Sequence, residues 1–262
     1  MSVQIISVDG TNVEVVQDGS GRDLVLLPTL LAELSVYDEV IAELSKNRRV
    51  HRINFPGFGG STGPIGSRVE DYANLIAGVM KELDLPKDTD VLGNGFGGFV
   101  AGTLAIHHGS MFDKLVLVDT GPGFPEEAIP PLKVMAGKVT SEGMASVLDI
   151  AIMRMFPEPY IDGHQAVIDR RKEKLSAADP ELFANAALSL ASLNNYEKLS
   201  EIKNETLVVV GLEDQTTPPF LSRDLHDGIK GSKFIELPGI GHCPQLQDPR
   251  AFMDAVSPFL EL

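Results

Sequence analysis

Three separate segments of the chain carry residues of the types used in nucleophilic attack on carbonyl compounds. The first is Gly93–Gly97, a Gly-Asn-Gly-Phe-Gly stretch between an apolar run and a helix-like one. It matches the Gly-x-Ser-x-Gly turn of a nucleophile elbow except at its centre, where Gly95 stands in place of serine. Asp214 follows a later apolar run, and His242 lies in a glycine-rich loop. An acid that orients a histidine base is typical of acyl transfer. Here the turn, the acid and the histidine follow one another along the chain in that order.

Alternating strand-like and helix-like segments surround these residues and predict an α/β fold. The apolar runs are typical of strands buried on both faces of a parallel sheet. The expected strands are Val3–Val8, Val13–Gln17, Leu24–Pro28, Val50–Asn54, Thr89–Gly93, Leu115–Val118, Thr206–Gly211 and Lys233–Leu237. The expected helices of this part are Ser35–Leu44, Val69–Leu83, Gly97–His108, Pro219–Ile229 and Pro249–Leu260. We therefore expect a mostly parallel eight-stranded sheet with helices on both faces, preceded by a hairpin turning at Asp9-Gly10.

The alternation stops between residues 121 and 202, where no buried strand is predicted. The helix-like segments there are Glu126–Ala136, Ser141–Met155, Gln165–Leu175 and Pro180–Leu193. We expect residues 121–202 to form a helical cap after the sixth strand, and residues 1–120 and 203–262 to form the core. Four methionines of this segment are expected either to line an apolar pocket or to fill the core of the cap. They are Met135, Met144, Met153 and Met155.

On these residues the sequence resembles the α/β-hydrolase superfamily over almost its whole length, in the branch of cap-bearing serine hydrolases. The resemblance implies that Asp214 is the triad acid and His242 the triad base. It places Gly95 at the nucleophile position, where the side chain is absent. It also implies that the backbone N–H groups of Phe96 and Leu30 form the oxyanion hole. The activity implied is hydrolysis of a small ester, a lactone or a related carbonyl compound, with no cofactor and no metal.

Three positions depart from the pattern of that family. Pro28-Thr29 stands where His-Gly is usual, Asn54 replaces an aspartate, and Gly95 replaces the nucleophile. An elbow strains a residue that has a side chain by about 1–3 kcal/mol, whereas glycine adopts its conformation freely. The change to glycine therefore removes the nucleophilic hydroxyl and leaves the fold intact. Two explanations fit the glycine at this position. Either the nucleophile was deleted so that the protein holds unreacted substrate, or the chain is a natural member of the family that forms no acyl-enzyme. A water molecule in the space left by the missing serine hydroxyl, with His242 as its base, would provide a residual route to hydrolysis.

Other functions also fit parts of the sequence. Gly93-x-Gly95-x-x-Gly98 matches a dinucleotide fingerprint, with Asp119 as a candidate ribose-binding acid 21 residues beyond Gly98. That fingerprint normally opens its domain, and an oxidoreductase of this kind would leave the acid and the histidine unexplained. A lyase or a cofactor-free oxygenase could use His242 and Asp214 as a proton-abstracting base. A small-ligand receptor without catalysis is the remaining alternative.

Composition limits the partners and the compartment. The chain has 262 residues, 43% of them hydrophobic and 23% charged, and a net charge of −15. Such a chain can bury a large core, and its acidic excess disfavours nucleic-acid binding. A single cysteine, Cys243, excludes an internal disulfide and a multi-cysteine metal site. Because we find no signal peptide and no long apolar run, we expect a cytoplasmic protein that acts on a small molecule and does not bind membranes. The sequence leaves its oligomeric state open.

Overall fold

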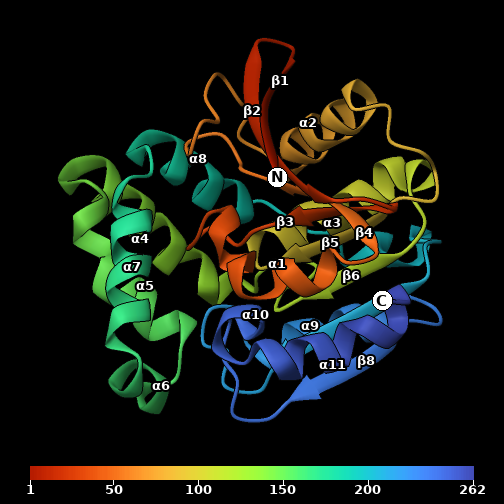
Figure 1. The fold of residues 1–262 in the computed structure, drawn as a ribbon. Helices are drawn as coiled ribbons and strands as arrows, with labels where there is room; N and C mark the ends of the chain where they lie inside the picture. The colour runs from red at the N-terminus through yellow and green to blue at the C-terminus, as the bar shows by residue number, and fades with distance from the viewer.

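Short apolar runs form the central strands of the protein, because a strand between two helical layers is buried on both faces. The computed structural model describes residues 1–262 and contains one sheet in the order β1-β2-β4-β3-β5-β6-β7-β8 (Figure 1). From β4 to β8 in this order, neighbouring strands are parallel, whereas β1 with β2 and β2 with β4 pair antiparallel. The strands are β1 Ser2–Val8, β2 Thr11–Gly19, β3 Arg22–Leu27, β4 Arg48–Ile53, β5 Asp90–Asn94, β6 Leu115–Val118, β7 Thr206–Gly211 and β8 Lys233–Leu237. The predicted fold class is confirmed.

Helices cover both faces of this sheet. The helices of the core are α1 Asp38–Leu44, α2 Val69–Glu82, α3 Phe96–His108, α9 Pro219–Gly228, α10 Pro244–Gln247 and α11 Pro249–Leu260. Helices α1, α10 and α11 contact one another on one face, and α2 packs against α3 on the other (Figure 1). The sequence predicted all of them but the single turn α10. No helix of the structure combines the length and the apolar character needed to cross a membrane.

Five further helices lie between β6 and β7 and form a separate group at the left of Figure 1. They are α4 Ile129–Glu142, α5 Leu148–Met155, α6 Glu158–Gly163, α7 Gln165–Ser176 and α8 Pro180–Leu190. The single helix predicted over 141–155 was wrong. Gly143 has a φ of 79° and ends α4, and a 3₁₀ turn at 144–147 precedes α5. The short helix α6 was not predicted.

Candidate active site

The chain makes a sharp turn from strand to helix at Gly95. This residue lies between β5 and α3 with φ 55° and ψ −119°, a backbone conformation that glycine adopts without strain. Its N–H donates to Val118 O at 3.0 Å, which ties the turn to β6. Its carbonyl accepts from Gly98 and Phe99, the first N–H groups bonded within α3. The predicted strand–turn–helix is therefore present with the geometry of an elbow.

A loop from β3 packs against the same helix end. Gly97 N–H donates to Pro28 O at 3.0 Å and holds the loop after β3 beside the start of α3. The N–H of Leu30 makes no hydrogen bond within the protein, and that of Phe96 has no acceptor within its own helix. Both residues line the same cavity, at a helix end that favours negative charge. Two free donors near a positive helix terminus suit an oxyanion.

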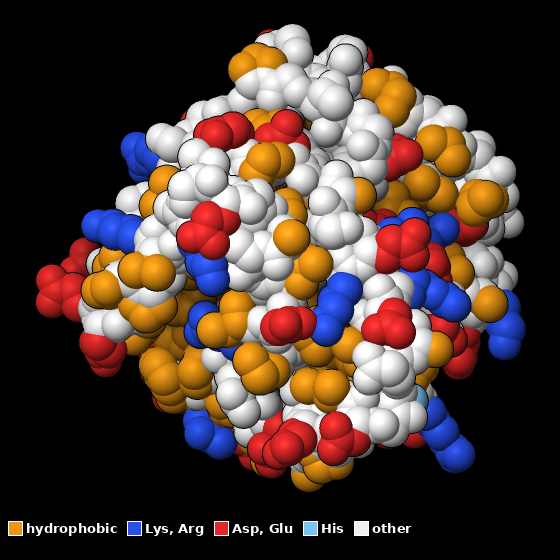
Figure 2. Space-filling view, turned by 90° about the vertical axis from the view of Figure 1, so that its left-hand side faces the viewer, with side chains coloured by type: hydrophobic (Ala, Val, Ile, Leu, Met, Phe, Trp, Pro, Cys, Tyr) orange, Lys and Arg blue, Asp and Glu red, His pale blue; other side chains and the backbone are white.

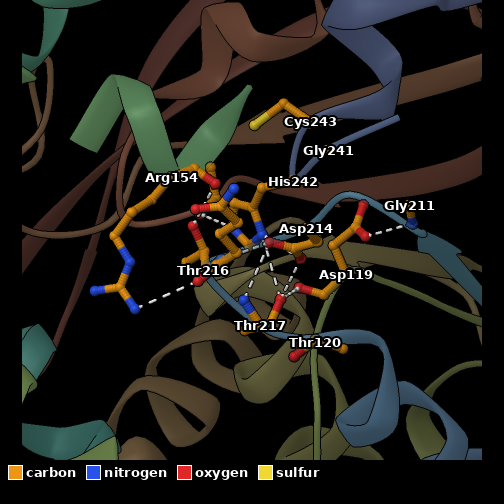
Figure 3. Close-up of polar contacts among 12 residues, drawn as sticks. Asp119, Thr120, Arg154, Gly211, Asp214, Thr216, Thr217, Gly241, His242 and Cys243 are labelled. Atoms are coloured by element: carbon orange, nitrogen blue, oxygen red, sulfur yellow. Dashed lines mark hydrogen bonds and ion pairs between the residues drawn. The ribbon is translucent and has the colours of Figure 1, made fainter. Parts of the chain in front are cut away.

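His242 and Asp214 come together at the carboxyl ends of β7 and β8, as Figure 3 shows. His242 Nδ1 donates to Asp214 Oδ2 at 2.8 Å, and both side chains are buried. The second carboxylate oxygen accepts from the N–H groups of Thr216, at 2.7 Å, and Thr217, at 3.1 Å. On the other side of the histidine, Asn94 Nδ2 donates to His242 O at 2.9 Å. These contacts fix the imidazole and leave Nε2 unprotonated, as a hydrogen-bond acceptor.

Sequence reasoning missed the hydroxyl of Thr217. Its Oγ1 lies 2.6 Å from Asp214 Oδ2, 2.7 Å from Asp119 O and 3.2 Å from His242 Nδ1. It therefore bridges the acid, the base and the end of β6. Aspartate and threonine are both ordinary residues of turns, so the sequence held no specific signal for this role.

The structure places Asp119 outside the cavity. Its side chain is fully buried, and Oδ1 accepts from Gly211 N–H at 2.7 Å. Burial, together with the nearby negative charge of Asp214, raises the pKa of this carboxyl well above 3.8. Asp119 does not line the cavity. Its position thus gives no support to a ribose-binding role.

A second hydroxyl reaches the histidine from the opposite side. Thr29 Oγ1 lies 2.9 Å from His242 Nε2, in the loop after β3. The side chain is buried and lines the cavity. The sequence marked Thr29 only as a departure from the usual glycine, because nothing local connects it to a residue 213 positions away.

These groups lie at one end of a cavity of about 570 Å³. Its wall includes Leu132 and Met135 of α4, Ile150 of α5 and Leu190 of α8. Of the four methionines considered above, Met135 alone lines it; Met144 and Met155 are buried elsewhere and Met153 is exposed. Figure 2 faces these helices and shows a hollow among apolar side chains. The cavity thus offers an apolar lining and one polar end. No three His, Cys, Asp or Glu side chains converge where they could hold a metal ion.

The model of the α/β hydrolase family matches residues 24–255. The chain belongs to this family. Among curated relatives, a pimeloyl-[acyl-carrier protein] methyl ester esterase of Aeromonas hydrophila is 28% identical over 95% of this chain and 99% of its own length. The 3-oxoadipate enol-lactonase 2 of Acinetobacter baylyi is 24% identical over 89% of this hydrolase and 86% of its own length. The crystal structure of an enol-lactonase from Burkholderia xenovorans has a TM-score of 0.92 and 26% identity, covering 99% of this chain and 100% of that one.

Proposed function

We propose that this hydrolase cleaves a small ester or lactone whose acyl part is apolar. The observation that carries the proposal is the buried His242–Asp214 pair, at 2.8 Å, beside two free backbone N–H groups at one end of the cavity. A base and an oxyanion site on the same cavity wall are the two parts that acyl transfer to water requires. The esterase and lactonase names of the relatives are consistent with this chemistry.

Each group has a defined task in this proposal. His242 Nε2 takes the proton of the attacking oxygen and returns it to the leaving alcohol. Asp214 holds the ring in the required tautomer and stabilises the imidazolium. The N–H groups of Leu30 and Phe96 bind the developing oxyanion, with about 3 kcal/mol of transition-state stabilisation from each donor. Gly95 contributes no side chain, so the attacking oxygen has another source.

The helices between β6 and β7 determine the substrate in this proposal. We assign residues 121–202 as the cap and residues 1–120 and 203–262 as the catalytic core. The apolar side chains of α4, α5 and α8 would bind the acyl chain, because burying each CH₂ group stabilises the complex by about 0.8 kcal/mol. A carbonyl bound beneath them would be shielded from solvent.

The test is an assay of p-nitrophenyl acetate, butyrate and octanoate and of five- and six-membered lactones, with wild type and His242→Ala. We expect turnover by wild type and a loss of at least ~10⁴-fold in kcat in the variant. His164→Ala is the matched control, because His164 is exposed and does not line the cavity. Equal rates for His242→Ala and wild type would contradict the proposal.

A further inference from the structure

The place that a side chain would take at the elbow is already filled. A Cβ added at Gly95 would overlap Thr29 Oγ1, and it would lie 2.6 Å from His242 Nε2 and 2.8 Å from Thr29 Cβ. Real Cβ atoms are not found at such distances from their neighbours. Residue 95 therefore cannot carry a side chain while Thr29 keeps its position. Gly95 makes room for the threonine.

The hydroxyl that fills this place has the contacts of a nucleophile. Thr29 Oγ1 is 2.9 Å from His242 Nε2, within reach for proton transfer. Because the other ring nitrogen donates to Asp214, Nε2 is the acceptor and the threonine is the donor. Thr29, His242 and Asp214 thus form a continuous chain of hydrogen bonds that ends in the cavity. Leu30, which follows Thr29 directly, has one of the two free N–H groups.

We propose that Thr29 Oγ1 is the nucleophile of this enzyme, supplied by the loop after β3 in place of the elbow residue. This inference rests on the proposed hydrolase function and names the residue that attacks the carbonyl. It makes Gly95 a structural requirement of the site. The chain departs from the family pattern by a side chain gained at position 29 and a side chain lost at position 95. The second change then makes room for the first.

The reaction balances with water as the only co-reactant. Oγ1 bonds to the carbonyl carbon as its proton passes to His242 Nε2, and the carbonyl π electrons move to the oxygen held by Leu30 and Phe96. When the tetrahedral intermediate collapses, the bond to the alkoxy oxygen breaks and the imidazolium protonates the leaving alcohol. Water, deprotonated by His242, then attacks the acyl-threonine. The carboxylic acid is released, and the proton returns to Oγ1.

A threonine that only orients His242 would have the same hydrogen bond, so the test must find the covalent bond itself. A fluorophosphonate probe reacts with an activated hydroxyl, which displaces fluoride and keeps the phosphonyl group. We would label wild type, Thr29→Val, Thr29→Ser and the double variant Thr29→Gly/Gly95→Ser, and locate the adduct by peptide mass spectrometry. Thr140→Val is the control for a lost threonine hydroxyl, because Thr140 lies exposed on α4. Circular dichroism would check that each variant folds.

We expect the adduct at position 29 in wild type and in Thr29→Ser, and at position 95 in the double variant. Thr29→Val should carry no adduct at position 29 and should lose at least ~10³-fold in kcat, whereas Thr29→Ser should stay within about tenfold of wild type. Gly95→Ser alone should be less stable than wild type and no more active. No adduct in wild type, an adduct elsewhere, or Thr29→Val as active as wild type would overturn the proposal.

The two proposals fail in different ways. Ester turnover that needs His242 but survives Thr29→Val would keep the hydrolase and reject the nucleophile. An adduct on Thr29 with no turnover of any ester or lactone would keep the nucleophile and reject the substrate class. The labelling needs no turnover of a substrate, so it tests Thr29 in either case.

Discussion

Two carboxyl groups lie close together behind the histidine, and they are not equivalent. Asp214 accepts two backbone N–H groups as well as the imidazole, while Asp119 Oδ1 accepts one backbone N–H and its Oδ2 has no partner. Burial and the charge of Asp214 raise the pKa of Asp119 well above 3.8. Like charges at close range cannot both ionise cheaply. Burial therefore favours the protonated form of Asp119.

This difference predicts how stability changes with pH at Asp119. Because its pKa is higher in the folded than in the unfolded state, the folded protein binds a proton that the unfolded chain releases above about pH 4. The stability that this proton contributes is present below about pH 4 and is lost as the pH rises toward the folded pKa. Asp119→Asn keeps an acceptor for Gly211 and has no proton to lose. Urea unfolding should therefore show this variant gaining stability over wild type between about pH 5 and 8.

The matched control is Asp162→Asn, at an exposed position on α6. Its unfolding free energy should differ from that of wild type by the same amount at both ends of this pH range. If the difference in unfolding free energy between Asp119→Asn and wild type stayed constant with pH, Asp119 would not retain its proton in the folded protein.

At the level of elements, the site depends on how closely α3 approaches the loop after β3. A Cβ added at Gly97 would overlap Leu27 O and lie 2.7 Å from Pro28 O, both backbone atoms that cannot rotate away. Gly97→Ala should push the start of α3 from the loop, lower the unfolding free energy by about 1–3 kcal/mol, and separate the N–H groups of Leu30 and Phe96, the two proposed oxyanion donors. We expect a lower kcat on esters and a lower midpoint in urea.

Helix α3 also contains a control for this substitution. A Cβ added at Gly102 meets no atom within 4 Å, so Gly102→Ala should stabilise the helix by about 1 kcal/mol and preserve activity. If Gly97→Ala were as stable and as active as wild type, a close approach of α3 to the loop would not be required.

The elements that the sequence predicted well are those whose signal is local. The strands Leu115–Val118 and Thr206–Gly211 have the predicted bounds, because a buried parallel strand is a nearly unbroken apolar run. The edge strand Lys233–Leu237 also has its predicted bounds, although most of it is at least partly exposed. The helix expected over 141–155 failed because its apolar spacing continues across Gly143, although the backbone does not. The turn at Gly95 and the paired Asp214 and His242 could be predicted from motifs, and the structure brings this acid and this histidine into contact. The Thr29–His242 contact could not, because it forms only when two distant loops meet on one sheet edge.

At the scale of the whole molecule, a buried cation links the helices of residues 121–202 to the core. Arg171 of α7 has a side chain only 4% exposed. Its Nη2 donates to Ser35 Oγ at 2.7 Å, and its Nη1 lies 3.8 Å from Glu33 Oε1. The Ser35 hydroxyl in turn donates to Glu33, so one short network joins α7 to the loop before α1. Helix α7 packs against α5, which lines the cavity. Through α7 and α5, the network therefore ties the wall of the cavity to the core.

Removing one partner of a buried ion pair leaves the other charge without compensation, at a cost of about 3–5 kcal/mol in unfolding free energy. At 3.8 Å the Arg171–Glu33 contact is at the long end for an ion pair, so we expect about 3 kcal/mol for Arg171→Ala in urea unfolding. Its neighbour Arg170 is exposed, and Arg170→Ala should change stability by less than about 0.5 kcal/mol. If the loss loosens α7 and α5 together, the KM for long-chain esters should rise more than that for acetate, since only a long acyl chain would reach the proposed cap. A loss of stability with every KM unchanged would mean that Arg171 holds α7 but does not set the cavity wall.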